Sequence, residues 1–130
     1  MNILDENVPE NQRQLLRGWR ISIRQIGFDI GHEGMQDSQI IPLLHELKRP
    51  TFFTLDPDFY KANLCHGGYS LAYLSVAQFE AAWFVRRVLR HKQLNSEAKR
   101  MGTVLRASHT GVTVWHIHAE NYIELNWTDL

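Results

Sequence analysis

Four aspartates are the residues of this sequence whose types and spacing could best support chemistry together. Asp5 directly follows the first apolar run of the chain, and Asp56 and Asp58 directly follow a later run of β-branched and aromatic residues. Asp37 lies at the predicted start of a helix that leads back into that second run. Since the carboxyl ends of parallel strands meet at one edge of a sheet, we expect all four carboxylates to converge there.

Neighbouring carboxylates resist joint ionisation, because each negative charge raises the pKa of the others. A divalent cation removes this conflict, and oxygen ligands favour a hard ion such as Mg²⁺ or Mn²⁺. Such an ion suits phosphodiester hydrolysis, where it activates a water molecule and neutralises the phosphate. The alternative is that these aspartates only cap helices and build turns. The number and placement of the four favour a catalytic metal site.

Strands and helices alternate along the part of the chain that must position the aspartates. The predicted strands cover residues 2–4, 21–24, 51–55 and 69–74, and the predicted helices cover residues 9–18, 37–49, 76–92 and 95–101. This order predicts an α/β fold with right-handed crossovers and a mostly parallel central sheet. Residues 103–107 and 112–118 flank a turn-like Ser-His-Thr-Gly segment and predict a C-terminal antiparallel hairpin, with one more strand at 122–127.

Length and composition predict a single domain over residues 1–130, because 44% hydrophobic residues suffice for one core. The single cysteine, Cys65, cannot form an internal disulfide, and residues 1–10 carry acids where a secretory signal needs basic and then apolar residues. We therefore expect a cytoplasmic protein. The longest nearly uncharged stretch, residues 64–79, falls short of the roughly 20 apolar residues of a membrane span.

Charge is unevenly distributed, although the 14 basic and 14 acidic residues cancel overall. Residues 80–106 contain seven basic residues and two acidic ones. Four of the basic residues fall on the long predicted helix or just after it: Arg86, Arg87, Arg90 and Lys92. They predict a contact with a polyanion. A merely solvated basic helix face is the alternative.

A second face of the same predicted helix carries Phe79, Trp83, Arg86 and Arg90 at positions i, i+4, i+7 and i+11. Tryptophan and arginine are favoured at protein interfaces, so we expect this face to contact a second copy of the chain or a small partner protein. Stacking on RNA and packing against the C-terminal hairpin are the alternatives.

Three short segments of the first half resemble the short PIN-like family. They are Leu4-Asp5-Glu6-Asn7, Asp37-Ser38-Gln39-Ile40 and Thr54-Leu55-Asp56-Pro57-Asp58-Phe59, which match the patterns LDEN, D-x-x-I and T-x-D-x-D-F in order. The resemblance covers roughly residues 1–75. It implies a three-layer α/β/α PIN-like fold and a Mg²⁺-dependent endoribonuclease, in bacteria often the toxin of a toxin–antitoxin pair.

The resemblance also implies roles for individual residues. Asp5, Asp37, Asp56 and Asp58 would be the catalytic, metal-binding acids, with Asn7 and Thr54 supporting them. RNA would then be the polyanion held by the basic helix, and a small antitoxin or a second copy would cover the face of Phe79 and Trp83.

Two other functions fit part of the pattern. The first is a catalytically inactive PIN-like scaffold that binds proteins. The second is a phospho-acceptor receiver domain, in which Asp5 and Glu6 follow the first strand and Asp56 the third. That domain requires a lysine at the end of strand five, where this chain offers Arg106, and it leaves Asp37 and Asp58 unexplained.

Overall fold

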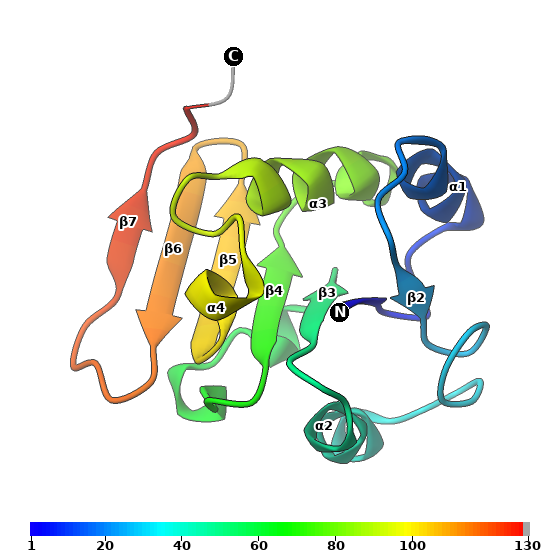
Figure 1. Cartoon of the computed structure of the whole chain (residues 1–130), viewed down its shortest axis with the longest axis horizontal. Helices are drawn as coiled ribbons and strands as arrows, with labels where there is room; N and C mark the ends of the chain where they lie inside the picture. Colours follow the sequence, from blue (N-terminus) through cyan, green and yellow to red (C-terminus); the bar gives the residue numbers. More distant parts are fainter. Residues whose placement is uncertain (129–130) are drawn as a thin grey trace.

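The computed structural model describes residues 1–128. Their central feature is one seven-stranded sheet in the order β2-β1-β3-β4-β5-β6-β7 (Figure 1). The strands are β1 (Asn2–Leu4), β2 (Arg24–Gln25), β3 (Thr51–Thr54), β4 (Ser70–Leu74), β5 (Thr103–Ser108), β6 (Gly111–His116) and β7 (Ile123–Leu125). The first five strands are parallel, and β6 and β7 are antiparallel to their neighbours. The predicted mostly parallel sheet and C-terminal hairpin are confirmed.

Four α-helices accompany the sheet within the described residues. They are α1 (Glu10–Gly18), α2 (Asp37–Glu46), α3 (Ala81–Arg90) and α4 (Glu97–Arg100), with 3-10 turns η1 (Pro57–Phe59), η2 (Ala62–Leu64) and η3 (Gln78–Glu80). The predicted helix 76–92 was too long at both ends, because residues 78–80 form the separate turn η3 and His91 is extended. The predicted helix 37–49 also ends early, at Glu46, because Leu47 is already extended and Arg49 has a positive φ of 52°.

The predicted second strand, residues 21–24, began too early and overlaps β2 only at Arg24. The Ile21 N–H still donates to the Leu16 carbonyl at the end of α1, at 3.0 Å, so this residue closes the helix. Parallel pairing with β1 begins only at Arg24, opposite Ile3. Alternating apolar residues indicated the strand correctly, but the helix termination occupied its first positions.

Two hydrophobic clusters pack on the two faces of the sheet. One contains Leu4 of β1 together with Leu16 of α1 and Val85 of α3. The other contains Ile3 of β1 together with Leu44 of α2. Because successive side chains of a strand point to opposite faces, α1 and α3 cover one face and α2 covers the other.

The chain passes from β1 to β2 on one side and then returns across β1 to β3 on the other. In open parallel sheets, ligands bind outside the carboxyl ends of the strands at such a reversal point. Asp5 and Thr54 stand at the ends of the two strands that flank it. Within residues 1–128, no helix has the length and apolar character needed to cross a membrane.

Candidate functional site

Three of the four predicted aspartates meet at the carboxyl edge of the sheet. Asp37 opens α2, Asp56 follows β3, and Asp58 lies in η1. One carboxylate oxygen from each lies within 4.8 Å of the others. Asp37 and Asp58 are exposed and Asp56 is half-buried. Three hard oxygen donors therefore converge on a point that solvent can reach.

A local turn fixes two members of this group. Oδ1 of Asp56 accepts a hydrogen bond from the Asp58 N–H at 2.9 Å. Pro57 between them has the fixed φ that suits the first position of a helical turn. The Asp56 N–H in turn donates to Oγ1 of Thr54 at 3.0 Å. Short-range hydrogen bonds within the segment Thr-Leu-Asp-Pro-Asp therefore fix the positions of Asp56 and Asp58.

Asp5 lies deeper than the other three aspartates and is only 6% exposed. Its Oδ2 accepts a hydrogen bond from the Thr54 hydroxyl at 2.7 Å, and its N–H donates to the Phe53 carbonyl at 2.9 Å. Burial raises the pKa of Asp5, and the charges of Asp56 and Asp37 raise it further, whereas the Thr54 hydroxyl lowers it. Asp5 is therefore electrostatically coupled to the group without being one of its three mutually close carboxylates.

Asp37, too, has a raised pKa. Loss of hydration raises the pKa of Asp37, as do the charges of Asp56 and Asp58, and the charge of Lys61 lowers it. Over residues 1–128, none of the four aspartates forms an ion pair with a basic side chain. The site thus has an excess of negative charge that a cation would neutralise.

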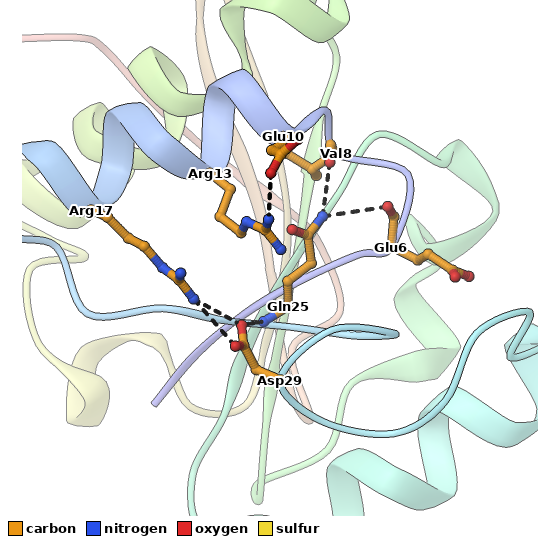
Figure 2. A network of polar contacts seen from close by, with 7 residues as sticks. All are labelled: Glu6, Val8, Glu10, Arg13, Arg17, Gln25 and Asp29. Carbon is orange, nitrogen blue, oxygen red and sulfur yellow. Dashed lines mark hydrogen bonds and ion pairs between the residues drawn. The ribbon is translucent and has the colours of Figure 1, made fainter.

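Gln25 of β2 supports the turn that carries Asp5, a role that sequence reasoning missed. Its buried side-chain Nε2 donates to the carbonyls of Asp5 at 3.0 Å, Glu6 at 3.3 Å and Val8 at 2.8 Å. Figure 2 shows this amide beneath the turn. Nearby, the Asp29 carboxylate accepts from Arg17 at 3.1 Å and from the Gln25 N–H at 2.9 Å. No sequence signal identifies Gln25, because its role depends on β2 lying beside β1.

Glu6 was also missed as a structural partner of the site. Its Oε1 accepts a hydrogen bond from the Gly34 N–H at 2.9 Å, so it holds the glycine-containing loop that precedes α2. Gly27 at the other end of this loop has a φ of 86°, and a Cβ there would come within 2.8 Å of Oε2 of Glu6. Asn7, predicted to support the site, is exposed, and its side chain forms no hydrogen bond with the described residues.

The predicted RNA-binding residues do not lie beside the aspartates. Arg86, Arg87 and Arg90 belong to α3, which packs on the opposite face of the sheet from α2, and Lys92 follows that helix. The guanidinium of Arg86 lies between two indole rings, 3.8 Å from the ring centre of Trp19 and 4.4 Å from that of Trp83.

Two of the four predicted interface residues, Phe79 and Trp83, are exposed, and with Leu15 and the half-buried Trp19 of α1 we define them as the aromatic patch. Phe79 is 70% exposed and Trp83 is 52% exposed. Trp83 contacts Trp19 of α1 edge to face, with ring centres 6.2 Å apart, rather than packing under the C-terminal hairpin. An open cavity of about 580 Å³ borders the patch along α1.

The fold and the site together define an α/β protein with an acidic cluster at the carboxyl edge of a parallel sheet. No protein-family model, curated protein or solved structure matches the chain.

Proposed function

We propose that this protein is a Mg²⁺- or Mn²⁺-dependent endoribonuclease. The observation that carries the proposal is the convergence of Asp37, Asp56 and Asp58 within 4.8 Å, beside the buried Asp5. Carboxylates at this number and spacing fit a small divalent cation, which binds a few acidic side chains together with waters and substrate phosphates. The exposure of Asp37 and Asp58 leaves room for those further ligands.

Asp37, Asp56 and Asp58 would hold the cation directly. When bound, it would supply a lowered pKa for the attacking water and charge neutralisation for the phosphate. Asp5, with Oδ2 engaged by Thr54, would accept the water proton at its other oxygen. Its raised pKa suits that role, because a general base works best when its pKa approaches the working pH.

The resemblance to the short PIN-like family supports the choice of RNA as substrate. We extend the proposal to a three-layer PIN-like arrangement, to the toxin of a toxin–antitoxin pair and to a cytoplasmic location. The aromatic patch of Leu15, Trp19, Phe79 and Trp83 supports a partner-binding role, with a small antitoxin or a second copy of the chain as the partner.

The test is cleavage of a labelled single-stranded RNA with and without Mn²⁺. We expect internal cuts that leave 5′-phosphates, complete inhibition by EDTA, and loss of cleavage in Asp56→Asn. Glu46→Gln, an exposed acid at the end of α2, is the matched control and should cut normally. Cleavage that survives EDTA and Asp56→Asn would contradict the proposal. Mn²⁺ binding without cleavage of any RNA would favour the catalytically inactive scaffold.

The receiver domain is a second candidate that one observation favours. The order β2-β1-β3-β4-β5 is also that of receiver domains. In that case Asp56 would accept a phosphoryl group from a small donor such as acetyl phosphate. A mass increase of one phosphoryl group in the native chain, absent in Asp56→Asn, would support this candidate over the nuclease.

A further inference from the structure

A row of polar side chains crosses the sheet beside the acidic site. Asp5 and Thr54 are joined by a hydrogen bond, and the following members are paired strand to strand by register. In strand order the row is Asp5, Thr54, Tyr73, Arg106, Thr113 and Glu124. Residues directly opposite one another point to the same face of a sheet. We call these six residues the polar row.

The polar row lies on the same face of the sheet as α2. It lies nearer the carboxyl edge than the residues that α2 buries. Leu71 and Val104, two residues before Tyr73 and Arg106, belong to the hydrophobic cluster of α2. Tyr73 and Arg106 themselves are half-exposed. A cavity of about 320 Å³ opens over the far part of the row, where Arg106 and Glu124 are among its lining residues.

Arg106 has binding capacity that the structure leaves unused. Its guanidinium donates to Ser75 at 3.2 Å, and Ser75 directly follows β4, so the side chain extends toward the carboxyl edge. Among residues 1–128, Arg106 forms no ion pair with a carboxylate. A guanidinium has five donors in a planar fork that matches phosphate geometry. The free donors are therefore suited to a phosphate group.

The position of Arg106 relates it directly to the acidic site. Thr54, which bonds both Asp5 and the Asp56 backbone, lies two strands away from Arg106. At a spacing of about 4.8 Å between strands, their Cα atoms lie roughly 10 Å apart. A nucleic acid strand with one phosphate at the aspartates would thus bring a neighbouring phosphate over β4 and β5.

Aromatic rings occupy the interval between the two positions. Tyr73 stands between Thr54 and Arg106 in the polar row, and Tyr60, which follows η1, lies with its ring centre 6.2 Å from that of Tyr73 at an angle of 33°. Bases of single-stranded nucleic acids stack on such rings without sequence preference. A phosphate donor set and an aromatic platform are thus adjacent on one open face.

We propose that Arg106 binds a phosphate that flanks the cleaved one, while a base between them stacks on Tyr73 and Tyr60. The inference rests on the proposed ribonuclease function and identifies its substrate as single-stranded RNA lying across β3, β4 and β5. It makes the open face of the sheet, rather than the basic helix α3, the principal RNA-binding surface.

The experiment measures binding of a fluorescein-labelled single-stranded RNA by anisotropy in Mn²⁺, on an Asp5→Asn background that keeps the three proposed cation ligands and removes the proposed base, so that cleavage is stopped. Arg106→Gln should weaken binding about tenfold, since a charge-assisted hydrogen bond is lost. The slope of log affinity against log salt should fall by about 0.7, the value for one phosphate of a single strand. Arg106→Lys should restore the slope but only part of the affinity, because it keeps the charge and loses the fork.

Arg24→Gln is the matched control: an exposed arginine of β2, remote from the polar row, whose loss should leave both values unchanged. Unchanged affinity and slope in Arg106→Gln would overturn the inference, as would a larger loss in Arg90→Gln of α3. Calorimetry with Mn²⁺ separates the two proposals. If Mn²⁺ binds normally but RNA affinity does not depend on Arg106, only the inference is overturned. If Mn²⁺ does not bind, the proposed function is overturned.

Discussion

The hydroxyl of Thr54 donates a 2.7 Å hydrogen bond to Oδ2 of Asp5 and so joins the carboxyl ends of β3 and β1. Oγ1 of Thr54 also accepts a hydrogen bond from the Asp56 N–H at 3.0 Å. One threonine thus connects the buried aspartate to the turn that carries the exposed ones. This link holds the residue that follows β1 beside the residues that follow β3.

Thr54→Val removes this link while keeping the side-chain shape. We expect a loss of about 1–3 kcal/mol in unfolding free energy, because the buried carboxylate loses its donor. The pKa of Asp5 should rise, since the hydroxyl lowers it in the native chain. If ionised Asp5 is needed for cleavage, the acidic limb of the pH–rate profile should move to higher pH.

The control is Thr51→Val. The buried hydroxyl of Thr51 lies at the other end of β3 and accepts a hydrogen bond from Arg100 at 2.9 Å. Thr51→Val should reduce stability without moving the acidic limb of the pH–rate profile. If that limb does not move in Thr54→Val, the proposed role of Thr54 is contradicted.

Asp5→Asn should change how stability depends on pH. Burial raises the pKa of Asp5 in the folded state, so the folded chain holds this proton to higher pH than the unfolded chain. Stability therefore falls as the pH rises from the ordinary carboxyl pKa through the raised pKa of the folded state. Asp5→Asn removes that fall, and urea unfolding should show it more stable than the native chain at neutral pH. Stability curves that run parallel for the two proteins would show that Asp5 does not titrate abnormally.

Gln25→Leu tests the support under the Asp5 turn. The substitution removes donors to three backbone carbonyls, and an unpaired buried polar group costs about 1–3 kcal/mol. We expect lower stability in urea and faster amide exchange at Val8, whose N–H donates to the Asp5 carbonyl at 3.1 Å. Exchange at Val8 equal to that of the native chain would show that Gln25 does not hold the turn.

Trp83→Glu tests the aromatic patch. If the patch binds a second copy, light scattering should show a smaller mass for the variant; if it binds a small antitoxin, the variant should bind that protein more weakly. Ile123→Glu, at an exposed apolar residue on β7, should change neither. Identical behaviour of Trp83→Glu and the native chain in both measurements would make the patch ordinary surface.

Local patterns predicted much of the fold and part of the site. The apolar runs before Asp5 and Asp56 gave the two strand ends, and the parallel order was enough to predict that acids would converge there. The sequence also placed Asp37 at a helix start, which the structure confirms as the first residue of α2. Each of these features depends on residues that are close in the chain.

Features that depend on long-range register were not predictable. Gln25 supports Asp5 only because β2 lies beside β1, and Arg106 joins the polar row only because β5 pairs with β4 in one register. The clustered charge of Arg86 and Arg90 is visible in the sequence, whereas the face of the sheet on which their helix packs is not, and RNA binding by these arginines stays a prediction.

Calorimetric titration with Mn²⁺ measures whether the carboxylate cluster of Asp37, Asp56 and Asp58 binds a divalent cation. We predict a single saturable site in the native chain, loss of that site in the double variant Asp37→Asn, Asp56→Asn, and normal binding in Glu46→Gln. Equal heats for the native chain and the double variant would contradict the account.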